Sequence, residues 1–224
     1  MYPDRVSHRP FKQRLYPQFA RVGQALASEK RLELLDLLAQ APRHVEALAE
    51  ETEMSLANVS QHLQILRRAR LVETDRDGTK ILYRLADQAV LRLWLALRSV
   101  AESRLAEVEQ LTREYAVDGA DERELPREEL ERLVERGEIY LIDVRPAIEY
   151  AHGHLPGAVS LPVDELPARL EELPRDRRIA AYCRGAYCLF ADEAVSLLRR
   201  HGFAAQRLEG GWPEWWAEGR PVSS

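Results

Sequence analysis

The chain has 224 residues, of which 31% are charged, and its formal net charge is −5. That length suits two domains with a core each, and two cysteines are too few for the disulfide framework of a secreted domain. No apolar run approaches the ~18 residues that span a bilayer and nothing resembles a signal peptide, so we expect a cytoplasmic protein, without membrane partners, whose thiols start reduced.

The first half of the sequence predicts helices and one hairpin. Residues 1–115 carry 18 Lys/Arg against 16 Asp/Glu, and residues 116–224 carry 14 against 21, so the first half is better suited to approach a polyanion. A basic segment, Arg5 to Arg14, has no clear period and is expected to be an arm or partly disordered. Helices are then expected over Phe19 to Leu26, Lys30 to Leu38, His44 to Glu51, Leu56 to Arg68 and, as one long pattern, Asp87 to Tyr115.

The helix over Leu56 to Arg68 carries a polar face. Ser55 is its expected cap, and the buried stripe formed by Val59, Leu63 and Leu66 turns polar residues outward. These residues are Asn58, Gln61, His62 and Gln64. Leu71 to Thr74 and Ile81 to Leu85, joined by a type I′ turn at Asp77-Gly78, predict a hairpin after this helix. A short helix, a turn, a polar-faced helix and a hairpin are typical of a winged helix-turn-helix.

Several of these side chains suit DNA contact. The amides of Asn58 and Gln61 match adenine edges, and Ser60 and His62 suit bases or phosphates. Arg76 and Lys80 flank the hairpin turn and suit phosphates. The candidate DNA-binding set is Ser55, Asn58, Ser60, Gln61, His62, Gln64, Arg76 and Lys80. Winged helices also bind proteins in some cases, but a basic wing beside a polar helix favours DNA.

The stretch from Ser55 to Val72 resembles the ArsR/SmtB-like repressors, and the resemblance covers about Phe19 to Tyr115. It implies a homodimer built on the first and last helices, with two recognition helices in successive major grooves of a double-stranded operator. Metal sensing is the default in that family. Here the third-helix region, Ala41 to Leu48, has no cysteine, and Asp87 to Tyr115 has no histidine. We therefore expect no metal site and no cofactor, and we interpret His44 as a solvated or capping residue.

The second half begins near residues 116–121. We expect a first domain over 1–115, a linker over 116–125 and a second domain over 126–224, with a helix starting at Pro126-Arg127. An apolar run from Ile179 ends at Cys183, a short loop follows, and Leu189 to Arg200 predicts a helix. Backbone N–H groups converging at a helix start lower a thiol pKa. Both cysteines of the chain, Cys183 and Cys188, lie in this loop, which indicates a reactive site.

Further motifs accompany the loop: Tyr140 to Arg145, Glu149 to Ala158, and Leu208 to Trp212. Together they resemble the rhodanese (sulfurtransferase) domain from about Leu125 to Val222. The resemblance implies an α/β domain with a central parallel sheet, and it makes Cys183 the sulfur-carrying nucleophile of a six-residue active loop. The candidate catalytic set is Cys183, Arg184, Gly185, Ala186, Tyr187 and Cys188, with Asp143 and Arg145 as supports that hold the loop. His152-Gly153-His154 falls within a structural motif of this domain.

The loop also narrows the chemistry. Related phosphatases and arsenate reductases carry an arginine six residues after the cysteine, where this chain has Leu189. Arg184 is the one charge of the loop, so a persulfide or another low-charge donor is at least as suitable as thiosulfate. Cys188 either resolves a persulfide on Cys183 or packs as a small residue at the helix start, and both interpretations stay open.

The sequence predicts a multi-domain protein, mostly α with a β-hairpin wing in its first half and α/β in its second. Three functions remain open. The first is a repressor whose operator binding responds to sulfur chemistry at Cys183. The second is a sulfurtransferase whose winged helix serves only for location or dimerisation. The third is a redox switch in which oxidation of Cys183 and Cys188 is the signal.

Overall fold

The computed structural model describes residues 9–115 and 124–224, and the chain divides into two compact units, Met1–Val90 and Leu91–Ser224. The division falls inside helix α5 (Gln88–Arg104), so most of α5 belongs to the second unit. The domain limit predicted from the sequence, at residue 115, instead assigns the whole of this helix to the first domain. That limit stays a prediction. Most of the expected linker over 116–125 lies outside the described residues.

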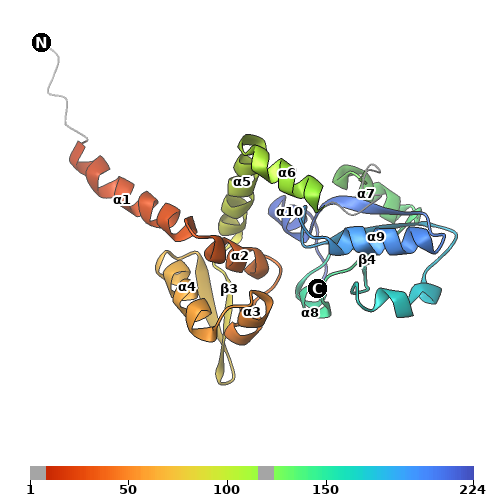
Figure 1. Cartoon of the computed structure of the whole chain (residues 1–224), viewed down its shortest axis with the longest axis horizontal. Coiled ribbons are helices and arrows are strands. Elements are labelled where there is room, and N and C mark those ends of the chain that lie inside the picture. Colours follow the sequence, from red (N-terminus) through yellow and green to blue (C-terminus); the bar gives the residue numbers. More distant parts are fainter. Residues whose placement is uncertain (1–8, 116–123) are drawn as a thin grey trace, which may run out of the picture. The chain divides into compact units, whose positions relative to one another are not determined.

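The first unit is a winged helix-turn-helix, as the sequence predicts (Figure 1). It combines helices with a small antiparallel sheet of order β1-β3-β2. The helices are α1 (Arg9–Leu26), α2 (Glu29–Leu38), α3 (Val45–Glu51) and α4 (Leu56–Arg68), and the strands are β1 (Arg43–His44), β2 (Val72–Asp77) and β3 (Lys80–Leu85). Fully buried leucines of α2, α3 and α4, among them Leu34, Leu48 and Leu63, form its core.

Two expectations for the first unit are wrong in detail. Helix α1 starts at Arg9 and runs through Pro17, so the part of the basic segment from Arg9 to Arg14 is helical, while Arg5 lies outside the described residues. The wing turn is Gly78-Thr79, because Asp77 pairs with Lys80. Only Gly78 of that turn has a positive φ, of 60°, which fits a type II′ turn and not the predicted type I′.

The long helical pattern from Asp87 to Tyr115 is two helices. Helix α5 ends at Arg104, and α6 (Ala106–Glu114) begins after Leu105, whose φ of −111° and ψ of 107° are extended. The apolar stripe continues across the break, and periodicity alone therefore did not show it.

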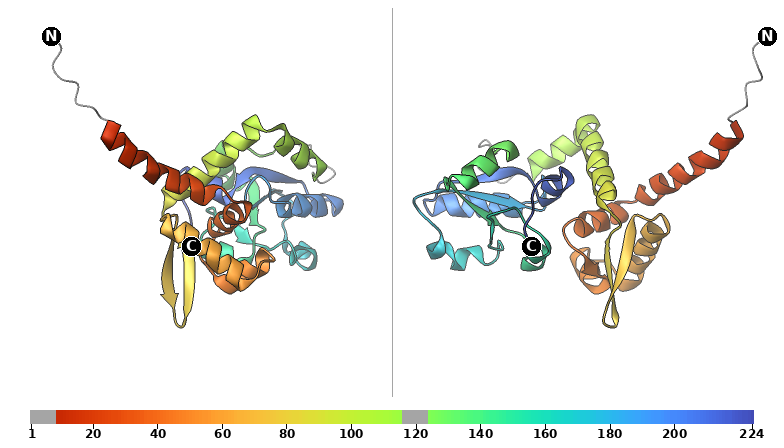
Figure 2. Two further views of the ribbon diagram at one scale, coloured as in Figure 1. Left: turned by 60° about the vertical axis from the view of Figure 1, so that its left-hand side comes forward. Right: turned by 180° about the vertical axis from the view of Figure 1, so that it is seen from behind.

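The second unit contains a parallel sheet of order β5-β4-β6-β7, which confirms the α/β prediction (Figures 1 and 2). The strands are β4 (Ile139–Asp143), β5 (Val159–Ser160), β6 (Arg178–Cys183) and β7 (Ala205–Gly211). The connecting elements are α7 (Arg127–Glu135), α8 (Ala147–His152), the 3-10 turns η1 (Leu166–Ala168) and η2 (Leu170–Glu172), α9 (Phe190–Arg200) and α10 (Trp212–Ala217).

Both faces of this sheet are buried, because crossover helices cover each of them. Side chains alternate along β6. Ile179, Ala181 and Cys183 face a core shared with α9, whereas Ala180 and Tyr182 face a core shared with α7 and α10. The alternation places Cys183 on the α9 face at the end of its strand. Among the helices of the described residues, none has the length and apolar character to cross a bilayer.

Candidate functional site

The cysteine loop, residues 183–188, lies at the carboxyl end of β6. In this sheet β4 leads outward to β5 and β6 leads the other way to β7, so the strand order reverses between β4 and β6. In open α/β sheets, ligands bind at such a switch point, outside the carboxyl ends of the strands. The cysteine loop therefore lies at the position where this class of fold binds its ligands.

Cys183 and Cys188 form a disulfide in the structure, with Cα atoms 6.2 Å apart. Cys183 is 1% exposed, and Cys188 is partly buried against the same core beside α9. The two sulfurs are therefore within bonding reach, as a resolving role for Cys188 requires. Its contact with the core equally fits a packing role, so both interpretations remain.

The charge of Arg184 is paired. Its Nε lies 3.1 Å from Oε2 of Glu149, a fully buried carboxylate on α8, and its Nη2 bonds the other carboxylate oxygen. In the sequence, Arg184 is the one charge of the loop. The ion pair neutralises that cation and ties the loop to α8.

Arg207 on β7 is a functional candidate that the sequence analysis missed. Its Nη2 donates to the carbonyls of Gly185 (3.0 Å) and Ala186 (2.7 Å), and its Nη1 donates to Asp192 Oδ2 on α9 (2.6 Å). The guanidinium thus holds the middle of the cysteine loop against β7 and the start of α9. An arginine directly before the motif from Leu208 to Trp212 is the signal that could have pointed to it.

Asp143 and Arg145 form a fully buried ion pair with a 2.7 Å contact. Tyr182 donates to Asp143 Oδ2 at 2.5 Å, and Arg145 donates to the Gly153 carbonyl at 2.8 Å. Burial lowers the pKa of Arg145, but the hydrogen bond and charge of Asp143 outweigh it and raise the pKa. These contacts hold the residue just before Cys183 and the turn after α8, so the pair supports the loop through its strand.

Two glycines allow the backbones to meet at the site. A Cβ on Gly211 would lie 2.3 Å from the Cys183 carbonyl and 2.5 Å from the Gly185 nitrogen. Gly185 itself has a φ of 130°, which side chains other than glycine rarely adopt. Strand β7 is also bulged here, since Ala181 pairs with Arg207 and Cys183 with Gly211. The lack of a side chain at Gly211 therefore allows β7 to pass directly beneath the cysteine loop.

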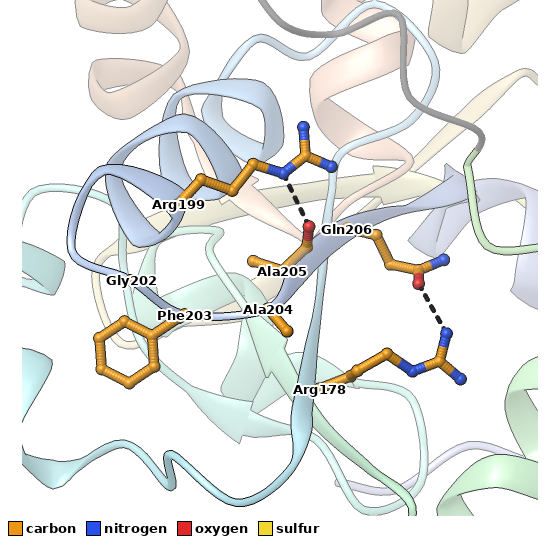
Figure 3. Close-up of a pocket in the computed structure, with 7 residues that line it drawn as sticks. All are labelled: Arg178, Arg199, Gly202, Phe203, Ala204, Ala205 and Gln206. Atoms are coloured by element: carbon orange, nitrogen blue, oxygen red, sulfur yellow. Dashed lines mark hydrogen bonds between the residues drawn. The ribbon is translucent and has the colours of Figure 1, made fainter.

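A separate hollow of about 770 Å³ lies at the amino ends of β6 and β7 (Figure 3). Arg178 on β6 donates to Gln206 Oε1 at 3.2 Å, and Arg199 donates to the Ala205 carbonyl at 2.9 Å. These contacts occupy the strand ends opposite the cysteine loop. The hollow is therefore not part of the sulfur site.

Helix α4 presents the predicted recognition face in part. Asn58 and Gln61 are exposed, whereas Ser60, His62 and Gln64 are half-buried, so the expected outward orientation of His62 and Gln64 is only partial. Ser55 Oγ accepts a hydrogen bond from the Asn58 backbone N–H at 3.3 Å, as a helix cap does. Asn58 and Gln61 are thus the members of this set on α4 whose side chains are exposed.

The wing carries its basic residues near its tip. Arg76 and Lys80 are exposed on β2 and β3. Arg84 bridges the carboxylates of Glu73 (2.7 Å) and Asp75 (2.8 Å), which partly offsets the acidic charge of β2. Two cations are thus left exposed at the end of a hairpin, an arrangement that suits phosphate contact.

His44 does not form part of a metal site in the described residues. Its Nε2 lies 3.0 Å from Asp77 Oδ2, and its Nδ1 lies 3.2 Å from the Ile81 carbonyl, so it joins β1 to the wing. Across residues 9–115 and 124–224, no group of three or more His, Cys, Asp or Glu side chains is placed to hold a metal ion.

Comparison with known proteins matches each half of the chain to a known family. Residues 28–74 match the family described as bacterial regulatory protein, arsR family, and residues 126–218 match the rhodanese-like domain. A sulfurtransferase of Allochromatium vinosum is 33% identical over 41% of this chain and 85% of its own length. The homodimeric winged helix-turn-helix domain Mb0332 of Mycobacterium bovis, a possible ArsR-family regulator, is 44% identical over 47% of this chain and 94% of that chain, with a TM-score of 0.42.

One relative has the architecture of the whole chain. The HTH-type transcriptional regulator Rv0324 of Mycobacterium tuberculosis is 47% identical over 211 residues, which cover 94% of this chain and 92% of the relative. At that identity and coverage the family is shared. The chain therefore belongs to the ArsR family of bacterial transcriptional regulators, in a form that carries a rhodanese-like domain after its winged helix.

Proposed function

We propose that this regulator is a cytoplasmic, homodimeric repressor whose affinity for a double-stranded operator is set by sulfur chemistry at Cys183. The observation that carries the proposal is the pairing of the chain's two thiols in one rhodanese-type loop, 6.2 Å apart at Cα, in a member of a transcriptional-regulator family. A regulator responds to a signal only if that signal favours one of two conformations of the protein. A covalent change in this loop would be such a signal.

The chemistry takes two balanced steps. A persulfide donor, R–S–SH, transfers its outer sulfur to the Cys183 thiol, so that a Cys183 persulfide forms and R–SH leaves. The Cys188 thiol then attacks Cys183 Sγ, and the outer sulfur departs as hydrogen sulfide while the disulfide forms. The two cysteine thiols are oxidised by two electrons, and the transferred sulfur is reduced to sulfide. A thiol reductant returns the loop to its first state.

The charges around the loop favour a donor of low charge. Arg184 is paired with Glu149, and Arg207 is paired with Asp192 and lies 3.4 Å from Glu124. A dianion such as thiosulfate gains little from cations whose charge is already compensated. A neutral or singly charged organic persulfide is the better substrate.

On the DNA side, we propose that Asn58 and Gln61 read bases and that Arg76 and Lys80 contact phosphates. The exposure of the two amides on α4 and of the two cations at the wing supports these roles. The remaining members of the candidate set, Ser60, His62 and Gln64, are half-buried, and Ser55 serves as the cap.

The test is DNA binding by the full-length protein in defined covalent states. The probe is a duplex selected from a random-sequence pool by the reduced protein, and intact mass identifies each sample as reduced, persulfidated or disulfide. Conversion of the reduced protein to the persulfide or the disulfide should weaken its binding to the duplex by about 5-fold or more. Cys183→Ser should retain the reduced-state affinity whatever donor is added, and added zinc should have no effect.

A sulfurtransferase relative with 33% identity favours a second candidate, an enzyme whose winged helix only locates or dimerises it. That function predicts multiple turnover of a persulfide donor with a thiol acceptor and equal DNA affinity in every state. Equal affinity on mass-verified samples would discard the repressor proposal in its favour. A response to peroxide alone, without a persulfide adduct by mass, would instead indicate a simple redox switch.

A further inference from the structure

The part of α5 that follows Val90 belongs to the same unit as the cysteine loop, and its Arg98 contacts α10. Arg98 Nη2 pairs with Oε1 of Glu214 on α10, and their side chains are only 14% and 13% exposed. Oε2 of Glu214 accepts from the Gly211 N–H at 2.9 Å. Arg98 is therefore linked through one carboxylate to the glycine that underlies the cysteine loop.

The same helix also contacts the loop itself. The Arg98 guanidinium carbon lies 5.6 Å from the centre of the Tyr187 ring. Glu102, one helical turn further on, pairs with Arg98 at 3.2 Å, and together with burial it raises the pKa of Tyr187. A methyl group on Gly185 would lie 3.4 Å from Arg98 Nη1 and 3.2 Å from Glu214 Oε1. Two of the four residues between the cysteines thus lie against α5 or its partner Glu214.

On the opposite side of the loop, Arg207 donates hydrogen bonds to the carbonyls of Gly185 and Ala186. Cys183 is fixed as the last residue of β6, and Cys188 lies two residues before α9. When the Cys183–Cys188 bond forms or opens, the change in backbone conformation must therefore be absorbed by residues 184–187. Those residues include the ones that α5 contacts.

We propose that α5 senses the covalent state of the cysteine loop through Arg98 and Glu102 and carries it toward the winged helix. The inference rests on the proposed function. Helix α5 is continuous from Gln88, in the first unit, to Arg104, so a rotation or shift of its second half is transmitted along its hydrogen-bonded backbone. If α5 is tilted in only one covalent state of the loop, the winged helix presents a different geometry to DNA in that state. Helix α5 would then be the element that has two arrangements.

The experiment compares the ratio of DNA affinities, reduced over disulfide, in wild type and in three full-length variants. Arg98→Gln removes the charge that joins Glu214, Glu102 and Tyr187. Glu102→Gln alters a side chain that is 36% exposed, so it tests the same contact even if Arg98→Gln fails to fold. The matched control is Arg113→Gln on α6, whose partner Glu109 is also four residues away and whose side chain is 77% exposed.

The wild-type ratio should be about 5-fold or more, and in Arg98→Gln and Glu102→Gln it should fall to within about 2-fold of one. Intact mass should still show the disulfide in both variants, and Arg113→Gln should keep the wild-type ratio. Wild-type ratios in both sensing variants would overturn this inference while the proposed function stands. A wild-type ratio of one would overturn the proposed function and the inference with it. Loss of the ratio in Arg113→Gln as well would show a general effect of surface charge and would also refute a specific role for α5.

Discussion

Replacing Asp143 with asparagine removes the negative charge from a pair that is 0% exposed on both sides. The carboxylate accepts from the Arg145 backbone N–H (3.0 Å), from its guanidinium Nη2 (2.7 Å) and from the Tyr182 hydroxyl (2.5 Å). Breaking a buried pair by removing one partner costs about 3–5 kcal/mol, because the other charge is left uncompensated. An amide keeps one accepting oxygen, so we expect about 3 kcal/mol, the lower end of that range.

The assay is urea unfolding of the second unit, followed by tryptophan fluorescence, since Trp212 and Trp215 are buried in the same core as Tyr182. A loss of about 3 kcal/mol should lower the midpoint by roughly 1–3 M urea. The control is Glu165→Gln, which removes an exposed partner of Arg169 and should cost less than about 1 kcal/mol. If Asp143→Asn shifted the midpoint no more than this control, the buried pair would not support the strand that carries Cys183.

Gly211→Ala should destabilise the second unit by about 1–3 kcal/mol in the same assay, because the new methyl group meets the Cys183 carbonyl at 2.3 Å. Gln61→Ala should weaken binding to the selected duplex by about 1–3 kcal/mol and leave random DNA unaffected, as measured by fluorescence anisotropy. Arg76→Ala should weaken both duplexes alike and reduce the salt slope by about 1. Burial and the bond to Glu102 raise the pKa of Tyr187 from 10.0 to about 12, so its contribution to stability should be lost as pH rises from about 10 through 12. Ultraviolet titration of wild type against Tyr187→Phe should show that late phenolate, and a phenolate already formed near pH 10 would contradict the contact.

The candidate site was predicted from sequence where neighbouring residues carry the signal. The loop from Cys183 to Cys188, its strand and its helix follow from an apolar run, a glycine and a helical pattern within about twenty residues. The cap at Ser55 and the exposed amides on α4 follow from helical spacing in the same way. The turn type and the continuity of the helix over 87–115 were predicted wrongly, because Gly78 suits two turn types and Leu105 fits the apolar stripe on both sides of its break.

The sequence by itself determined the two modules, the recognition helix and the position of both thiols, because these depend on local period and on motifs. Only the tertiary structure decided which distant charges meet the loop. Glu149 neutralises Arg184 from 35 positions away, and Arg98 reaches Glu214 across 116 positions. No periodic pattern encodes such pairs, since they arise where strand order and crossover helices bring separate segments to one edge of a sheet. The loop's chemistry is thus visible in the chain, while its charge balance and its link to α5 exist only in the fold.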